Sequence, residues 1–503
     1  MFFERTFQSQ IIQDELYGSK TSKSKPSSKR RTAFHLVKDK AKSYLVLFLE
    51  TSSIHGLNHM VAIGRHPLEV VLWLTMVGLS VFGSVYLSRT TWTRYQSSPT
   101  VVSMDRDMFA WNTTFPCVTI CPNNNLDLKK LEVYVKNSKE KDKAKLEAFI
   151  KALANATFDN FNLIPDYDGI PSDKYMELIL NLTASFKPTL TIGASGIMLD
   201  IVPTITEMGL CYAVNSQVAV YNSPAYRVAN RWDEVSTQNS TFFVHPLDGE
   251  VFAQVINISA SYDVYVHGPS EVPDISTKRQ HSDEDFYMKL YVTALTVYTT
   301  PDAARLSVAQ RRCRFLNENI LKHSSVYTYT MCRMECRIRL CLKYCNCIPH
   351  FYRKIGDEKI CNVKDLQCLY KYKGKETHHV FRLTIVLIKL ILHLFRIDEL
   401  YKLQEKDGKK INCGCLPICD DVNYVIQSNA LQEWFLGTNL QWGIVTYPRM
   451  RYKRDIIFGF TDVLVAVGGM AGLFLGCSVL SFMEIVYFLT LRLICYTHAA
   501  VTK

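Results

Sequence analysis

Two long apolar segments constrain the fold of this 503-residue chain more than any other feature. The first runs from about Leu68 to Leu87 with only Glu69 charged, and the second runs from about Val463 to Leu491 with only Glu484 charged. Each is long enough to cross a bilayer, which takes roughly 20 helical residues. The first lies too far from Met1 for a cleaved signal peptide, and no small-residue cleavage site follows it. The chain is therefore predicted to cross a membrane twice.

The distribution of charge predicts the orientation of the two spans. A stretch rich in Lys and Arg, residues 19–42, precedes the first span, and basic flanks stay in the cytoplasm. Because the basic excess behind the net charge of +11 lies beside a span, it does not indicate a nucleic-acid partner. A solvated topology signal explains it, and binding to lipid headgroups is the alternative. Both termini are predicted to be cytoplasmic, in a protein of the plasma membrane.

Glycosylation motifs and cysteines agree with this topology. Fourteen of the 16 cysteines lie between the spans, where an oxidising extracellular compartment favours disulfides. The run CRMECRIRLCLKYCNC has spacings that suit zinc in a cytosolic protein, but outside the cell disulfides are favoured and no metal site is predicted. Five Asn-x-Ser/Thr acceptors also lie between the spans: Asn112, Asn155, Asn181, Asn239 and Asn257.

Local patterns predict a mixed α and β domain between the spans. Residues 1–45 are polar and basic and are expected to be mostly disordered. Residues 127–154 carry apolar residues at helical spacing on a charged background, which is typical of a solvated surface helix. Residues 261–273 and 285–301 alternate between polar and apolar, which predicts strands. The chain contains no internal repeat.

The second apolar segment has a face of small residues. Gly468, Gly472 and Gly476 recur every four residues, which lets helices approach closely in lipid. Simple helix packing would explain that face, but Glu484 follows Gly476 by eight residues, on a similar face of a regular helix. A carboxylate at that depth is costly unless it faces water or a partner. Small residues above an acidic ring, repeated around a symmetry axis, predict a cation-selective pore.

Short motifs along the whole chain resemble those of one known family. In order they are His55-Gly56 before the first span, FPCVTICPNNN after it, TEMGLCYAVNS, HGPSEVP, the cluster from Cys313 to Cys419, Gly476-Cys477-Ser478, and Glu484. Each motif is weak alone. In this order, between two spans, they resemble the degenerin/epithelial sodium channel family, and most closely its insect pickpocket branch. Cys117 stands where that family usually has a small residue.

The resemblance implies a trimeric channel fold, with two transmembrane helices and a large disulfide-rich α+β ectodomain of palm strands with a helical finger and thumb. It implies a voltage-insensitive, sodium-preferring, amiloride-blockable channel, either a homotrimer or a heterotrimer with related subunits. Sodium is the permeant ion and no cofactor is expected. An unidentified extracellular chemical or mechanical stimulus would open it through the ectodomain.

The resemblance also assigns roles to individual residues. It places the selectivity filter at Gly476, Cys477 and Ser478, the acidic pore residue at Glu484, the gating motif at His55 and Gly56, and a pore-mouth position, where bulky side chains hold the channel open, at Val465. It pairs Cys121 with Cys211, Cys313 with Cys419, Cys332 with Cys415, Cys336 with Cys413, Cys345 with Cys368, and Cys347 with Cys361. Spacing alone leaves many connectivities open. Cys117 and Cys341 are left over, and they either pair, stay free or are misassigned.

The expected domain organisation follows from the spans. It comprises a cytoplasmic segment 1–66, a first transmembrane helix 67–88, an extracellular domain 89–455 with a thumb-like part 313–419, a second transmembrane helix 456–491 and a cytoplasmic end 492–503. Residues 376–400 form an atypical insert between Cys368 and Cys413. Within it, residues 380–397 read as a basic amphipathic helix rather than a third span. Translated intron sequence is the favoured explanation, since an apolar insert between paired cysteines lacks an obvious burial site.

Other functional classes explain fewer of these sequence features. A two-span purinergic-type receptor channel shares the topology, but it does not explain Gly-x-Ser followed by a glutamate. If the chain were a non-conducting adhesion or scavenger receptor, the face of small residues on the second span would serve only for helix packing. An enzyme is not predicted, because the chain lacks a Gly-x-Ser-x-Gly elbow, a His-Glu-x-x-His motif and a phosphate loop.

Overall fold

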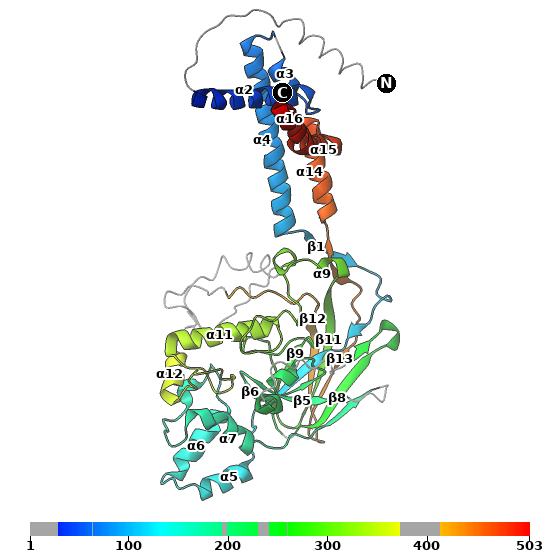
Figure 1. Cartoon of the computed structure of the whole chain (residues 1–503). Coiled ribbons are helices and arrows are strands. Elements are labelled where there is room, and N and C mark those ends of the chain that lie inside the picture. The colour runs from blue at the N-terminus through cyan, green and yellow to red at the C-terminus, as the bar shows by residue number, and fades with distance from the viewer. Residues whose placement is uncertain are drawn as a thin grey trace, which may run out of the picture. The chain divides into compact units, whose positions relative to one another are not determined.

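The computed structural model describes residues 29–62, 64–193, 199–229, 241–258, 260–372 and 413–502. The insert 376–400 and Asn239 lie outside these residues. The chain divides into two compact units (Figure 1). The helical unit comprises Met1–Arg94 with Phe460–Lys503, and the disulfide-rich unit comprises Tyr95–Gly459.

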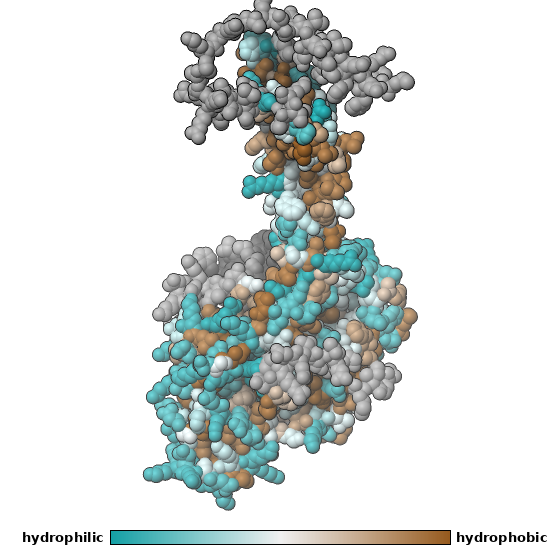
Figure 2. Space-filling view, in the orientation of Figure 1, coloured by the Kyte–Doolittle hydropathy of each residue, from teal (hydrophilic) through white to brown (hydrophobic). Residues whose placement is uncertain are grey.

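The helical unit is built from the two ends of the chain. Its helices are α2 (Lys29–Thr51), α3 (Leu57–Val61), α4 (Pro67–Ser97), α14 (Phe460–Leu475), α15 (Val479–Tyr487), a π-helical turn (Phe488–Arg492) and α16 (Leu493–Thr502). Two helical stretches among the described residues are long and apolar enough to cross a membrane, Pro67–Ser97 and Val479–His498. Hydrophobic side chains cover this unit's helices, whereas the visible face of the disulfide-rich unit is mostly hydrophilic (Figure 2). The two-span prediction is confirmed at this level.

Two helices of this unit extend beyond their predicted limits. Helix α2 shows that the expectation of disorder was wrong for residues 29–45, and its sequence contains no Gly or Pro to interrupt a helix. Helix α4 continues past residue 88 to Ser97. The hydroxyls of Thr90, Thr91 and Thr93 each donate to the carbonyl four residues earlier, so these polar residues remain compatible with a helix. Pro99 then disfavours helical geometry in the residue before it.

The disulfide-rich unit contains two main sheets. The larger has the order β1-β14-β11-β13-β8-β4, with β12 also paired to β11, and the smaller has the order β10-β9-β3-β6-β5. The strands of the larger sheet are β1 (Thr100–Asp105), β4 (Thr189–Ile192), β8 (Val251–Ile258), β11 (Phe286–Thr299), β12 (Asp421–Glu433), β13 (Thr438–Ile444) and β14 (Arg451–Ile456). Those of the smaller are β3 (Cys117–Pro122), β5 (Ile201–Thr206), β6 (Gly209–Val214), β9 (Tyr262–His267) and β10 (Gln280–Ser282), and β2 (Thr113–Thr114) pairs with β7 (Phe243–Val244).

Strand β11 organises the larger sheet. It pairs antiparallel with β12 and parallel with both β13 and β14, so that residues 286–299 join segments from the far end of the unit. Alternate residues of β8 are buried, as the pleat requires for a strand with one face toward a core. That core includes Trp442, which is fully buried and donates its indole N–H to the carbonyl of Pro116 at 3.0 Å. The strands predicted within 261–273 and 285–301 are present as β9 and β11.

Helices surround a second hydrophobic core. The helices that contribute to it or pack against it are α5 (Leu128–Asn137), α6 (Lys143–Ala154), α7 (Tyr175–Leu182), α8 (Pro224–Ala229), α11 (Tyr329–Cys345) and α12 (Val363–Lys371), with the 3₁₀ turns η1 (Phe161–Leu163) and η3 (Ala219–Asn222). The other short helices of this unit are α9 (Pro301–Ala304), α10 (Val308–Arg311), η2 (Ser172–Lys174) and η4 (Pro246–Asp248). The single helix expected over 127–154 is two helices. Asp142 caps the second one by accepting from the amide of Lys145 at 3.0 Å, which starts a new helix within the charged stretch.

Six disulfides link these elements. The cysteine pairs are Cys121–Cys211, Cys313–Cys419, Cys332–Cys415, Cys336–Cys413, Cys345–Cys368 and Cys347–Cys361. They are the pairs that the family resemblance implied, and five of the six fall within residues 313–419. Cys117 and Cys341 are buried and form no disulfide.

Candidate functional site

The second apolar helix is interrupted at the motif that the sequence singled out. Helix α14 ends at Leu475, and Gly476 has a φ of +64°, a left-handed conformation that side chains other than glycine's disfavour. Ser478 then caps α15 in a reciprocal arrangement with Ser481. The continuous helix expected over 456–491 was therefore wrong. The argument that placed Gly476 and Glu484 on one face of a regular helix no longer applies.

The loop that contains His55 lies against this interruption. The backbone amide of His55 donates to the carbonyl of Leu475 at 3.1 Å. A Cβ atom built on Gly476 would lie 1.8 Å from Nδ1 of His55. Gly476 is thus required twice, once by its own backbone conformation and once by the imidazole packed against it. This contact brings together residues that are more than 400 positions apart in the sequence.

Gly56 completes the loop. Its φ is +89°, and it precedes the short helix α3. A Cβ atom at Gly56 would lie 2.8 Å from a methyl group of Val77 on α4. The glycine therefore allows both the turn of the loop and its close approach to the first apolar helix.

Glu484 is bound by the same loop. Its carboxylate accepts a hydrogen bond from the backbone amide of Ser53 at 3.1 Å. The hydroxyl of Ser53 donates to that of Ser481 at 2.8 Å, and Ser481 is only 3% exposed. A carboxylate that accepts hydrogen bonds is far less costly within an apolar segment than an isolated one. The acidic residue is therefore tied to the segment immediately before His55.

The structure gathers six of the seven predicted pore and gating residues and leaves one apart. Gly476, Cys477 and Ser478 form the interruption, the loop with His55 and Gly56 lies against it, and Glu484 is bound to the same loop through Ser53. Val465 lies on α14, is 74% exposed, and takes no part in these contacts. The sequence analysis missed Ser53 and Ser481. The signal for Ser481 is its spacing from Ser478, since two hydroxyl residues three positions apart are typical of a helix N-terminus.

Aromatic contacts extend the junction between the two ends of the chain. Phe48 packs edge-on against Phe488, with ring centroids 5.3 Å apart, and the hydroxyl of Tyr44 donates to the carbonyl of Phe488. Tyr44 also packs against Tyr496, with centroids 4.9 Å apart. Helix α2 thus contacts the end of the second span at several points.

The remaining predicted sites lie in the disulfide-rich unit. Four of the five glycosylation acceptors are described and all are exposed: Asn112, Asn155, Asn181 and Asn257. Burial raises the pKa of the Cys117 and Cys341 thiols well above the usual range, so both stay protonated and unreactive. Among the residues that the structure describes, no cluster of three or more His, Cys, Asp or Glu side chains is arranged to hold a metal ion.

These features define a class: a membrane channel protein with two apolar helical spans, the second one interrupted, and a large disulfide-rich unit. The family model described as "Amiloride-sensitive sodium channel" matches residues 48–488. The chain belongs to this family, whose members are ion channels. The match covers the first span, the whole disulfide-rich unit and the second span as far as residue 488.

Several characterised proteins are similar over most of their length. The sodium channel protein Nach of Drosophila ananassae is 20% identical over 89% of this chain and 86% of its own. Pickpocket protein 11 of Drosophila melanogaster is 23% identical over 91% and 77%, respectively. Acid-sensing ion channel 1C of Danio rerio is 22% identical over 88% and 82%. A solved structure of a proton-activated chloride channel aligns with 84% of this chain and 97% of its own, at 8% identity and a TM-score of 0.21.

Proposed function

We propose that this chain is a subunit of a trimeric, sodium-preferring, amiloride-sensitive cation channel of the plasma membrane. The observation that carries the proposal is the interruption of the second span at residues 476–478, held by a loop from the first end of the chain. The family match supports a sodium channel. The trimer, the ion preference and the plasma-membrane location are parts of the proposal.

The interruption suits a narrow ion path. Where a helix breaks, backbone carbonyls no longer have their intrahelical donors and can replace the hydration shell of an ion. Gly476, Cys477 and Ser478 carry no bulky side chain, so three copies can approach closely around an axis. Glu484, one helical segment further along, would raise the local cation concentration. An intramembrane carboxylate is by default a functional residue, and here its partner is the amide of Ser53.

The loop of residues 52–56 is the proposed gating element. It touches the constriction through the bond from His55 to Leu475, and it touches the acidic residue through Ser53. A displacement of this loop therefore changes both parts of the ion path together. In this proposal the disulfide-rich unit is extracellular and glycosylated, and converts an unidentified chemical or mechanical stimulus into motion of the spans. Lipids and related subunits are the expected partners, and sodium is the permeant ion rather than a cofactor.

The direct test is the whole-cell current in oocytes that express Val465→Phe. Because Val465 is 74% exposed on α14, a larger side chain there can be accommodated and can prop neighbouring copies apart. A sodium current blocked by amiloride is expected without any stimulus. Leu464→Phe is the matched control, since Leu464 is the adjacent residue, is 64% exposed and points to another face of the helix. Equal currents from both variants would contradict a specific pore-mouth role.

A second variant tests the constriction itself. Ser478→Phe, in the Val465→Phe background, should abolish the current or remove its preference for sodium while surface trimers persist. Unchanged sodium selectivity with normal surface expression would overturn the assignment of residues 476–478. Deleting residues 376–400 in parallel separates a silent channel caused by the insert from one that needs a partner subunit.

A further inference from the structure

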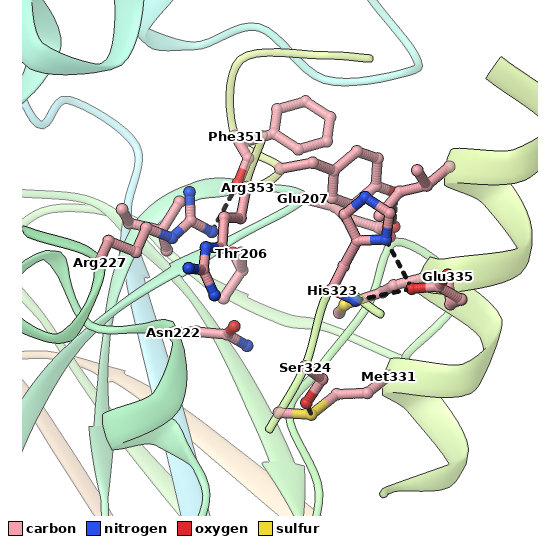
Figure 3. A pocket seen from close by; sticks show the side chains of 14 residues that line it. Thr206, Glu207, Asn222, Arg227, His323, Ser324, Met331, Glu335, Phe351 and Arg353 are labelled. Carbon is pink, nitrogen blue, oxygen red and sulfur yellow. Dashed lines mark hydrogen bonds and ion pairs between the residues drawn. The ribbon is translucent and has the colours of Figure 1, made fainter. Parts of the chain in front are cut away.

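Arg227 is an unusual arginine within the disulfide-rich unit. It lies on α8, and its guanidinium is close to that of Arg353, which follows α11 and the segment 346–352 (Figure 3). Burial, with the nearby charge of Arg353, lowers the pKa of Arg227 to about 10, and burial lowers the pKa of Arg353 to about 10 as well. Both remain cationic at neutral pH. The two guanidinium charges are therefore close together in a partly desolvated place. This raises the free energy of the folded state unless an anion lies beside them.

In the part of the chain that the structure describes, Arg227 has no carboxylate partner. Among the described residues, one amino group of its guanidinium donates to the carbonyl of Phe351 at 2.7 Å, while Nε is buried and has no hydrogen-bond partner. Buried arginines elsewhere in this unit are paired with acids. Arg337 binds Glu207 and Asp274, Arg333 binds Asp274, and Arg311 binds Glu318. Arg227, which is partly buried, differs from these arginines because it has no carboxylate partner among the described residues.

A second buried polar group faces the same place. His350 is 6% exposed, and its Nδ1 has no hydrogen-bond partner among the described residues. Burial, and then the charge of Arg227, lower the pKa of His350 to about 4, so the imidazole is neutral at physiological pH. A neutral imidazole can donate one hydrogen bond, and in native structures buried polar side chains usually have a partner. The missing partner is therefore a second, independent indication of a ligand.

These groups border a cleft. Its outer part has a volume of about 310 Å³ and is lined by Ser172, Asp173, Met176, Arg227, His350, Tyr352, Arg353, Lys354 and Ile360. Its inner part, of about 40 Å³, shares Arg227, Tyr352 and Arg353 with the outer one and has room for no more than a few water molecules. The outer volume is within the range of small-molecule sites. The arginines lie where the two parts meet.

The three acidic residues that line the cleft are already engaged, and the first of them, Glu335, pairs with His323 at 2.7 Å. Asp173 pairs with Lys354 at 3.5 Å at the surface. Glu207, on the inner wall, accepts from Arg337 at 2.6 Å and is also bound by the hydroxyl of Tyr352. None of the three carboxylates is bonded to Arg227. The cleft therefore offers a cationic group at its inner end and apolar surface from Met176, Ile360 and the ring of Tyr352 further out.

We propose that this cleft binds a small carboxylate with a short apolar body. The carboxylate would accept from Nε of Arg227 and from His350, and the apolar part would lie against Met176 and Ile360. Two parallel N–H groups of a guanidinium match the two oxygens of a carboxylate. An inorganic anion would leave the apolar walls unfilled, which is why a carboxylate with a hydrocarbon chain is favoured. The ligand would join three segments that are distant in sequence: residues 172–176, α8 and residues 350–360.

The experiment uses the full-length chain purified in lipid nanodiscs and measures binding by isothermal titration calorimetry. Hexanoate is the probe, and hexanamide, which has the same shape but no charge, is its control. Hexanoate should bind the wild-type chain at least 10-fold more tightly than hexanamide. The substitution Arg227→Gln keeps a donor for the carbonyl of Phe351 and should weaken hexanoate binding by about 10- to 100-fold, because it removes a charge-assisted hydrogen bond. Met176→Trp, which fills the cleft and leaves both arginines in place, should weaken it to a similar degree.

Arg305→Gln is the matched control, because Arg305 is exposed in the same unit and pairs only with exposed Asp302. It should bind hexanoate as the wild type does. Equal binding by the wild type and Arg227→Gln, or no binding by the wild type at 10 mM, roughly the weak end of useful affinity, would overturn the proposal. Tighter binding of inorganic phosphate than of hexanoate would overturn the carboxylate class. If Arg227→Gln does not fold, Met176→Trp decides alone. No current is recorded, so the result is independent of whether the chain conducts.

Discussion

The two units of this molecule bury their side chains in very different ways. In the disulfide-rich unit, large side chains such as Trp442, Phe149 and Phe161 are fully enclosed in two cores. In the helical unit, only 6% of the most apolar 18-residue stretch of the first span is buried. For the second span the buried share is 11%. The disulfide-rich unit is stabilised by its own packing and by its disulfides. The helical unit leaves most of its apolar surface exposed, where it can contact lipid or other helices.

The difference also concerns the kind of contact that each unit relies on. Among the described residues, the helical unit is held by hydrogen bonds such as those from His55 to Leu475 and from Ser53 to Glu484, and by a few aromatic contacts such as Phe48 to Phe488. Regions with few buried apolar contacts open most easily, and moving elements are drawn from them. The helical unit is therefore expected to change conformation more easily than the disulfide-rich unit.

Removal of the disulfide between Cys121 and Cys211 should strongly destabilise the disulfide-rich unit. The pair is 90 residues apart in sequence and joins β3 to β6. A loop of this length predicts a loss of about 4.5 kcal/mol when both cysteines are replaced by Ala. Hydrogen exchange of the full chain in detergent should show the loss in the smaller sheet and leave the exchange of α4 unchanged.

Cys495→Ala is the control, because Cys495 is exposed and forms no disulfide. Equal increases of exchange in both units of the double variant would contradict the view that the disulfide-rich unit is stabilised independently.

Arg337→Leu should have the second-largest effect. The guanidinium is 1% exposed and binds Glu207 at 2.6 Å together with Asp274, which are themselves buried. Removing one partner leaves two carboxylates in a place of low polarity, which costs about 4 kcal/mol. Denaturant unfolding monitored by tryptophan fluorescence would measure the loss.

Arg305→Leu serves as the comparison. It removes the exposed pair with Asp302 and should change stability by less than about 0.5 kcal/mol. Similar losses from both variants would mean that the buried network adds nothing beyond a surface ion pair.

The contrast between the units also explains what the sequence could reveal. Alternation predicted β9 and β11 because a strand that packs one face on a core must alternate. The spans followed from length and hydropathy. The six disulfides required the family resemblance, because spacing leaves the pairing open. The network of Arg337 was not anticipated, since its partners Glu207 and Asp274 are 130 and 63 residues away.

The interruption at Gly476 shows why the candidate site was only partly predictable. Repeated glycines in an apolar helix are equally compatible with close packing and with a break. What distinguishes the two is the backbone conformation of Gly476 and its contact with His55, which depend on a segment from the other end of the chain. The residues with the relevant chemistry were identified from motifs. Their mutual contacts, and the parts played by Ser53 and Ser481, emerged only in three dimensions.

Gly476→Ala should have a moderate and local effect. A left-handed φ costs a non-glycine residue roughly 1–2 kcal/mol, and the added methyl group would also collide with His55. We expect the loop of residues 52–56 to be displaced, with faster hydrogen exchange at residues 52–56 and 475–484. The midpoint of unfolding of the disulfide-rich unit should not change.

Gly468→Ala is the matched control, because Gly468 lies within α14 and has open space where a Cβ atom would be. It should be neutral or stabilise the helix by up to about 1 kcal/mol. Equal exchange at residues 52–56 in the two glycine variants would show that the loop does not depend on the interruption.

The smallest expected effect concerns a titratable link in the more stable unit. His323 is held between two carboxylates, with Nδ1 2.7 Å from Glu335 and Nε2 3.0 Å from Glu358. Burial alone would lower the pKa of His323, but the hydrogen bonds to these glutamates outweigh it, so the pKa is raised. Burial would likewise raise the pKa of Glu335, and the bond to His323 reverses this, so that pKa is lowered.

The sign of the pH dependence follows from these directions. A group whose pKa is raised on folding stabilises the folded state fully below its unfolded pKa, and this contribution is lost as pH rises through the folded pKa. The His323 contribution should therefore be present in mildly acidic solution and disappear on alkalinisation. That of Glu335 is present above its unfolded pKa and is lost as pH falls through the depressed folded pKa. Hydrogen exchange of residues 321–360, corrected for intrinsic rates, should increase as the pH rises from mildly acidic to alkaline, by the equivalent of about 1–2 kcal/mol. In His323→Gln, which keeps a neutral hydrogen-bonding side chain, this alkaline increase should vanish. If the variant retained the full increase, the pH dependence of exchange would have to be assigned to a group other than His323.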